Sequence, residues 1–206
     1  MLQGRLPWLR PEELNVEQRR IYESIVGGPR SAESKATLTD EAGRLQGPFN
    51  VMLVEPKVGD AVQRLGATLR FEAHLDDRAR EIAILEVARA SLSAYEWYVH
   101  EKESRMLGFS DAEIAGLLAG SDIPTLSQRE VIVRQVTRHL LDDGDLPTAI
   151  YDRALGELGL PVLVDLVFLV GYYEMLARSL RVWRTPLPHG AALPVFSAAS
   201  EDETPT

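Results

Sequence analysis

The sequence predicts an all-α fold, and three observations support this prediction. Apolar residues in the stretch 56–72 recur three or four positions apart, the spacing of one helical face. The pattern Ser-x-x-Glu, typical of a helix N-terminus, occurs at Ser93, Ser110 and Ser127. Strict alternation of apolar and polar residues is scarce, and no convincing hairpin turn interrupts the chain. Helices packed on helices are therefore the expected architecture.

The predicted helices follow one another along almost the whole chain. The first covers 11–26, with Pro11 near its first turn and Gly27 and Gly28 at its end. The polar stretch 29–50 has scattered Gly and Pro, which predicts mostly loop. Further helices are predicted over 56–72, 76–90, 93–107, 110–119, 127–141, 147–158 and 161–181.

Length and composition fit one domain. The chain has 206 residues and 45% hydrophobic content, enough to form a substantial core. We expect a single all-α domain over 1–184, followed by a Pro- and Ser-rich tail over 185–206. "REIAIL" at 80–85 resembles "REVIVR" at 129–134, which leaves open a bundle of two similar helical halves.

Charge and composition exclude several classes of function. The net charge is −9 without a basic stripe, so we expect no nucleic-acid partner. The longest apolar run, 160–171, is interrupted by Asp165, and we expect no membrane span. The N-terminus lacks the apolar segment of a signal peptide, which predicts a soluble cytoplasmic protein. There is no cysteine, so disulfides, thiolate metal sites and thiol redox chemistry are excluded within this chain.

Two stretches within 47–118 carry a family resemblance. They read "GPFNVMLVEP" and "RAREIAILEVARASLSAYEWYVHEKESRMLGFSDAEIAGLL". This text resembles the carboxymuconolactone decarboxylase and alkylhydroperoxidase D (AhpD) superfamily. The resemblance implies an AhpD-like helical bundle with its motif core over 47–118. It also implies a homo-oligomer, a trimer or a hexamer, with a pocket near a subunit interface.

The superfamily has a peroxidase branch, whose motif is only half present. Its pattern is Glu, then Cys-x-x-Cys, then His, and it falls here on Glu81, Ser93, Glu96 and His100. Glu81 and His100 match, but both cysteines are replaced. A serine hydroxyl is far less acidic than a thiol and does not pass through a sulfenic acid. The chain is therefore not expected to be a thiol peroxidase.

The decarboxylase branch has Glu-x-x-x-His at the same place, and here "EWYVH" supplies Glu96 and His100. Their i, i+4 spacing puts both on one helical face. The resemblance implies a cofactor-free reaction in which a lactone acid loses CO2 and the dienolate is protonated. His100 would be the general acid or base, and Glu96 and Glu81 would orient it or bind substrate.

Each proposed catalytic residue also has a structural interpretation. Glu96 could complete a capping box with Ser93, and the two roles can coexist. Glu81 can reach Glu96 only if "SLS" at 91–93 folds the chain back, and it could instead form a buried pair with Arg80 or Arg89.

Four further residues are candidates for binding a small-molecule substrate. For the two tyrosines among them, packing or subunit contact is the more common role of such side chains. They are Tyr95, Phe49, Asn50 and Tyr172. Tyr95 lies near Trp97 and Tyr98, and Tyr172 is followed by Tyr173. No HExxH motif or His pair at ligand spacing occurs, so we expect no metal and no other cofactor.

The competing hypothesis is a degenerate, non-catalytic AhpD-like scaffold that binds a small ligand or a partner. The missing cysteines are compatible with lost function as well as with changed function. The surroundings of His100 distinguish the two hypotheses. A pocket with both acids nearby favours an enzyme, whereas a His100 enclosed by packing favours a scaffold.

Overall fold

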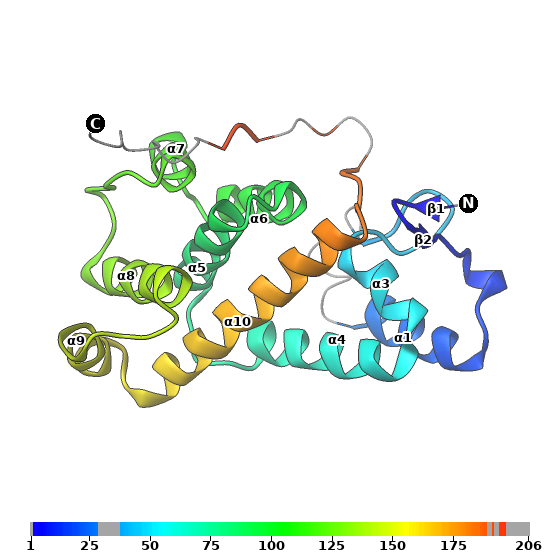
Figure 1. The fold of residues 1–206 in the computed structure, drawn as a ribbon, viewed down its shortest axis with the longest axis horizontal. Coiled ribbons are helices and arrows are strands. Elements are labelled where there is room, and N and C mark those ends of the chain that lie inside the picture. Colours follow the sequence, from blue (N-terminus) through cyan, green and yellow to red (C-terminus); the bar gives the residue numbers. More distant parts are fainter. Residues whose placement is uncertain (1, 29–37, 189–190, 192–193, 197–206) are drawn as a thin grey trace, which may run out of the picture.

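A bundle of α-helices follows a small N-terminal hairpin in the computed structural model, which describes residues 2–28, 38–188, 191 and 194–196 (Figure 1). The hairpin pairs β1 (Leu2–Gln3) with β2 (Leu6–Pro7) and is followed by the 3₁₀ helix η1 (Pro11–Glu13). The helices are α1 (Val16–Val26), α3 (Pro48–Val54), α4 (Pro56–Phe71), α5 (Asp77–Ala90), α6 (Ala94–Met106), α7 (Asp111–Ala119), α8 (Gln128–Asp142), α9 (Thr148–Leu158) and α10 (Leu160–Val182). The all-α prediction is confirmed.

Helix α5 lies at the centre of the bundle. Every residue from Ala79 to Ala88 is buried, and α5 packs against α6, α7, α8 and α10. This buried stretch contains three charged residues, Arg80, Glu81 and Glu86. Buried charges are tolerated only when they are paired, so the partners of these residues define the interior chemistry of the protein.

Helix α10 is the longest helix and crosses the molecule diagonally, from α9 toward the N-terminal hairpin (Figure 1). It packs against α3, α4, α5, α8 and α9. Its mean hydropathy of 1.7 would by length and composition allow a membrane span, but half of that window is buried inside the bundle. Asp165, the charge that interrupts its apolar run, accepts hydrogen bonds from the backbone N and Nδ1 of His74 at 2.8 and 3.0 Å. The core helix of a soluble protein can be as long and as apolar as a membrane-spanning helix. The expectation that the protein has no membrane partner therefore stays a prediction.

Two of the three predicted capping boxes are confirmed. Ser110 with Glu113 and Ser127 with Glu130 exchange side-chain and backbone hydrogen bonds at the starts of α7 and α8. The box predicted at Ser93 is wrong, because Ser93 makes no side-chain cap. Its ψ is 91°, whereas ψ is 159° and 162° at the other two N-caps. The tight turn before it, in which Leu92 has φ of 51°, sets this different geometry.

Several short elements were not predicted from the sequence. Residues 11–26 are not one helix, because Asn15 is extended and caps a new helix with Gln18. Within the stretch predicted as loop, 29–37 lie outside the described residues, and α3 begins at Pro48. Proline suits the first turn of a helix, so this signal was misread as a loop breaker. The N-terminal hairpin was also missed, because its strands have only two residues each.

The N-terminal hairpin is held against the end of α10. Arg5 N donates to Trp183 O at 2.8 Å, and Arg5 Nη1 donates to Val182 O at 3.0 Å. Gly4 has φ of 62° and lies so close that a Cβ there would overlap the carbonyl of Trp183. The N-terminal hairpin therefore contacts the chain at the predicted boundary between the helical domain and the C-terminal tail, residue 184. That boundary itself stays a prediction.

Candidate active site

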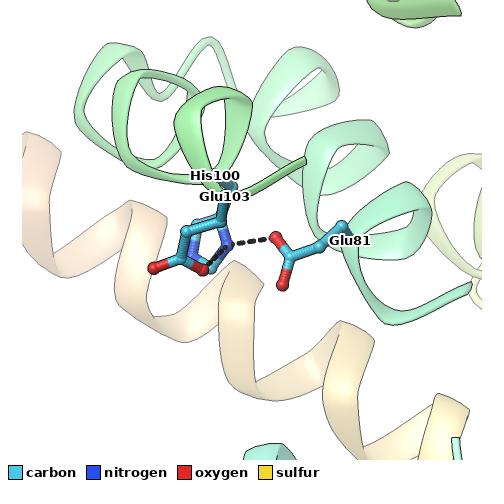
Figure 2. Close-up of side chains that lie close together, drawn as sticks. All are labelled: Glu81, His100 and Glu103. Atoms are coloured by element: carbon cyan, nitrogen blue, oxygen red, sulfur yellow. Dashed lines mark hydrogen bonds and ion pairs between the residues drawn. The ribbon is translucent and has the colours of Figure 1, made fainter. Parts of the chain in front are cut away.

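Glu81 and His100 meet in the interior between α5 and α6 (Figure 2). The turn at 91–93 folds α6 back along α5, as their interaction requires. His100 Nδ1 lies 2.7 Å from Glu81 Oε2, and the two residues are 6% and 0% exposed. An ionised carboxylate only accepts hydrogen bonds, so the proton of this bond belongs to Nδ1. In the neutral imidazole, Nε2 then carries the free lone pair and is the position that can act as a base.

Two residues that the sequence analysis missed complete this cluster. Glu103 Oε2, one turn further along α6, lies 3.5 Å from His100 Nδ1. Arg70 of α4 forms a short hydrogen bond with Glu103, and its Nη1 lies 3.6 Å from Glu81 Oε1. The spacing of Glu103 from His100 was a usable local signal. Arg70 had none, because only tertiary packing brings α4 to this point.

The charges of the cluster stabilise one another. Burial alone would raise the pKa of Glu81, but His100, Arg70 and Arg80 outweigh it and hold that pKa below its usual range. Arg80 Nε donates to Glu81 Oε1 at 3.3 Å, so one predicted pairing of Glu81 exists beside the histidine contact. Arg89, the other predicted partner, bonds Glu86 instead. Glu81 is therefore an ionised carboxylate that fixes the orientation of His100.

Tyrosine rings from α10 close the cluster. The ring of Tyr173 packs edge-on against His100 with centroids 5.1 Å apart, and Tyr172 packs against Tyr173 at 5.4 Å. Both tyrosines are buried, and burial is the main cause that raises the pKa of Tyr173 above its usual range. Tyr172, predicted to bind substrate, is therefore separated from His100 by its neighbour.

Glu96 is buried near the start of α6, and neither carboxyl oxygen has a hydrogen-bond partner among the described residues. Burial raises its pKa to about 8 and outweighs the nearby Ser93 side chain, which lowers it. The capping role predicted for Glu96 is thus wrong. At neutral pH it is a protonated carboxyl, and it lies one helical turn before His100 on the same face of α6.

The other predicted substrate-binding residues lie apart from the dyad. Asn50 Nδ2 donates to Pro7 O at 3.0 Å and so holds the N-terminal hairpin. Phe49 packs against the larger hydrophobic cluster of the protein. Tyr95 covers Gly47, where a Cβ would overlap its ring. The "GPFN" stretch and Tyr95 are therefore neighbours, but Asn50 and Phe49 are engaged in packing.

A pocket of about 300 Å³ opens between the start of α6 and the end of α10. Two arginines and several apolar residues line it, and neither His100 nor Glu81 does. Its lining residues are Ser91, Leu92, Ser93, Ala94, Tyr95, Ala177, Leu180, Arg181, Arg184, Thr185, Pro186 and Leu187. Of the predicted site residues, Tyr95 reaches this pocket, and Glu96 follows it directly in sequence.

Glu81, His100 and Glu103 could also be considered as metal ligands, since their donor atoms lie within 4.8 Å of one another (Figure 2). Two carboxylates and an imidazole suit several divalent cations. However, Arg70 and Arg80 already occupy the carboxylate oxygens and supply positive charge. A metal would have to displace Arg70, so this donor set does not favour a resident metal ion.

Comparisons with known proteins agree on the fold and on a family. Residues 56–139 match the carboxymuconolactone decarboxylase family. No curated protein sequence matches the chain. Among solved structures, an uncharacterised peroxidase-related protein from Silicibacter sp. TM1040 has a TM-score of 0.72 at 13% identity, over 92% of this chain and 94% of its own.

Two further structures are similar. An uncharacterised peroxidase-related protein with an AhpD core, from Ralstonia eutropha JMP134, has a TM-score of 0.70 at 14% identity, over 92% of this chain and 94% of its own. An AhpD-like protein of unknown function from Agrobacterium tumefaciens has a TM-score of 0.62 at 17% identity, over 69% of this chain and 99% of its own. At sequence identities this low, the structural similarity shows the fold alone. The family match covers residues 56–139 of this cysteine-free chain, and the similar structures share its AhpD-like helical fold.

Proposed function

We propose that the protein is a cofactor-free acid–base enzyme that acts on a small carboxylate or lactone, in the manner of the decarboxylase branch. One observation carries this proposal. The Glu96 carboxyl is buried without a hydrogen-bond partner among the residues that the structure describes, one turn from the buried His100–Glu81 dyad. An unpaired buried carboxyl destabilises a fold, and such groups are typical of functional sites.

The dyad supplies the base. Glu81 holds the proton on His100 Nδ1 and thereby leaves Nε2 free to exchange a proton. Arg70 and Glu103 limit the movement of both side chains, because each contacts a member of the dyad. Tyr173 excludes water from the ring face. A general base held in one tautomer and orientation is the arrangement that proton transfer requires.

Glu96 supplies the acid. Its pKa of about 8 keeps it protonated at neutral pH, so it can donate a proton without a preceding charging step. It occupies the position of the second cysteine of the peroxidase branch, which is where that branch carries its chemistry. A carboxyl at this position replaces thiol redox chemistry with proton transfer.

The pocket at the start of α6 fits the proposed substrate class. Arg181 and Arg184 are cationic, and the first backbone amides of α6 point to the same end. Together they favour an anion such as a carboxylate. A volume of about 300 Å³ matches a single-ring substrate, at the low end for ligand pockets.

The proposed reaction breaks the bond between the substrate ring and its carboxylate. The electron pair moves toward the lactone carbonyl, CO2 departs, and Glu96 or protonated His100 delivers a proton to carbon. The arginines and the helix N-terminus hold the carboxylate beforehand. No cofactor is required, because the lactone itself accepts the electron pair.

The scaffold hypothesis has one observation in its favour. His100 and Glu96 are only 6% and 4% exposed, and the lining of the pocket includes neither of them and not Glu81. In a non-catalytic protein the dyad would be an interior ion pair and Glu96 a relic of the lost cysteine position. The two hypotheses differ in whether substitutions that preserve the fold abolish turnover.

The test is turnover of γ-carboxymuconolactone and a panel of related lactone acids, measured as CO2 release. The variants are Glu96→Gln and His100→Gln, with His139→Gln as the matched control. His139 lies on α8 with its ring paired to Asp143, far along the chain from the pocket. Circular dichroism establishes that each variant is folded.

We expect turnover in the wild type and in His139→Gln, and a loss of at least about 100-fold in both site variants. Equal turnover in all four proteins would contradict the assignment of the acid and the base. No turnover in the wild type on any lactone acid would discard the decarboxylase hypothesis and favour the scaffold.

A further inference from the structure

The outward face of α10 is apolar along most of its length. Between Leu160 and Met175 the only charged residues are Asp165 and Glu174, and both are half-buried at its edges. In a protein with 26% charged residues, such a helix face in water is unusual. The exposed residues, called the α10 stripe below, are Leu160, Pro161, Val164, Val167, Phe168, Gly171 and Met175.

We infer that the α10 stripe is the interface with a second copy of this chain, in which two α10 helices cross in antiparallel orientation at Gly171. This inference goes beyond the proposed function and does not depend on it. A two-fold interface must be self-complementary, so that residue i meets residue j and j meets i. The stripe meets this condition around its midpoint.

Exposed residues occur at matching distances on both sides of Gly171. Val167 and Met175 lie four residues away, and Leu160 and Val182 lie eleven residues away. An antiparallel crossing at Gly171 would therefore bring Val167 onto Met175 of the second copy, and Leu160 toward its Val182. Both pairings are apolar, and both occur twice in the dimer.

Charge supports the same arrangement. Arg178 is 80% exposed and lies seven residues after Gly171, whereas Asp165 lies six residues before it. An antiparallel crossing at Gly171 places Arg178, which pairs with Glu174 of its own chain, opposite Val164 of the other copy, and so keeps the two arginines apart. Asp165 is held by His74 of its own chain. A parallel pairing would put the arginines together, and like charges at an interface are unfavourable.

Gly171 has no explanation within a single chain. A Cβ at this position would meet nothing within 4 Å, so neither packing nor backbone conformation requires glycine. Glycine in a helix interior is less favourable than alanine. Its benefit is close approach of another backbone, as at the crossing point of two helices.

A membrane is the other possible cover for an apolar helix, and the structure disfavours it. The opposite face of α10 carries Tyr173 and packs into the bundle, so a span would separate α10 from the core. The net charge of −9 also opposes binding to an anionic lipid surface.

The first test is the molar mass by light scattering. We expect the wild type to have an even number of chains, and Phe168→Glu or Gly171→Leu to halve its mass. Val58→Glu is the matched control, because Val58 and Phe168 are both 61% exposed but Val58 lies on α4. Gly171→Leu is informative because a single chain has room for the side chain.

The second test uses the absence of cysteine in the chain. Gly171→Cys introduces one thiol at the proposed axis, and mild oxidation should link two chains in high yield at low protein concentration. Met106→Cys, at a position 71% exposed on α6, should stay largely unlinked. The inference would be overturned if the wild type were a monomer or had an odd number of chains. It would also be overturned if only Val58→Glu halved the molar mass, or if the two cysteine variants formed cross-linked dimers in equal yield. Binding of uncharged phosphatidylcholine vesicles that Phe168→Glu abolishes would overturn it in favour of a membrane.

Discussion

Helix α5 carries two fully buried glutamates, Glu81 and Glu86, whose surroundings differ in one respect. Glu86 is surrounded by arginines only. Its Oε1 accepts from Arg134 Nε at 2.5 Å and from Arg138 Nη2 at 3.0 Å, and its Oε2 accepts from Arg89 Nη2 at 2.9 Å. Glu81 also contacts arginines, but its shortest bond is to His100.

The difference separates a structural cluster from a chemical one. Arginine does not lose its proton in proteins, so the Glu86 cluster has a single charge state. Burial would raise the pKa of Glu86, but Arg138 and Arg134 outweigh it and lower that pKa. Glu81 instead meets an imidazole, which has one ring nitrogen that donates and one that accepts a hydrogen bond, so the Glu81 cluster can take part in proton transfer. Glutamate on α5 thus has a structural role where its partners are arginines and a chemical role where its partner is a histidine.

A third glutamate, Glu96, is buried, but neither of its carboxyl oxygens has a hydrogen-bond partner in the part of the chain that the structure describes. The two α5 glutamates have depressed pKa values, whereas the pKa of Glu96 is about 8. These three buried glutamates therefore divide into two ionised carboxylates and one protonated carboxyl.

The pH dependence of stability should report Glu96. In the unfolded chain the Glu96 carboxyl loses its proton near its ordinary pKa of 4.5. In the folded state its pKa is about 8, so the carboxyl stays protonated up to about that pH. Stability should therefore fall by about 1.4 kcal/mol per pH unit between these values, roughly 5 kcal/mol in total, and level off above them. Urea unfolding of the wild type and of Glu96→Gln from pH 4.5 to 8.5 measures this. Parallel curves for the two proteins would show that Glu96 is ionised or hydrated in the folded state.

Replacing Glu86 should cost about 3–5 kcal/mol of unfolding free energy at pH 7. Glu86→Gln leaves the buried guanidinium of Arg134 without its counter-charge, which is the expensive way to break a buried ion pair. The measurement is urea unfolding. The control is Glu101→Gln, a partly exposed partner of Arg105, which should cost less than about 1 kcal/mol. Equal losses in the two variants would contradict the structural role of the Glu86 cluster.

The Glu81–His100 contact should contribute less than the Glu86 cluster. A double-mutant cycle of Glu81→Gln and His100→Gln should give a coupling free energy of about 1–2 kcal/mol at pH 7. Because the pKa of Glu81 is depressed, this coupling should be present above pH 4.5 and decrease as the pH falls below it. A coupling that grows on acidification would mean that Glu81 is not the ionised partner.

The smallest effects should separate Ser93 from the serines that cap helices. Ser127→Ala removes a hydrogen bond to the start of α8 and should cost about 1 kcal/mol. Ser93→Ala removes no cap and should change stability by less than about 0.5 kcal/mol. Thermal unfolding of both variants suffices. A comparable loss in both would show that Ser93 does cap α6.

Much of the fold could be predicted from local sequence. The helical spacing of apolar residues and two capping boxes located α4, α5, α7 and α8 to within about two residues. The short elements escaped, because α3 starts with a proline and has only seven residues. The candidate site was predicted in part: the family motif indicated Glu81, Glu96 and His100, and the structure brings Glu81 to His100. Glu103 and Arg70 were missed.

The sequence by itself determined an all-helical chain, the absence of thiol chemistry and the spacing of Glu96 from His100. These follow from composition and from distances of a few residues along one helix, which backbone geometry fixes. Tertiary structure alone decided which buried acids find cations. Arg70 reaches the dyad from α4, and Arg134 reaches Glu86 from α8. Packing leaves Glu96 without a partner, because desolvation and pairing depend on neighbours distant in sequence, which no local pattern encodes.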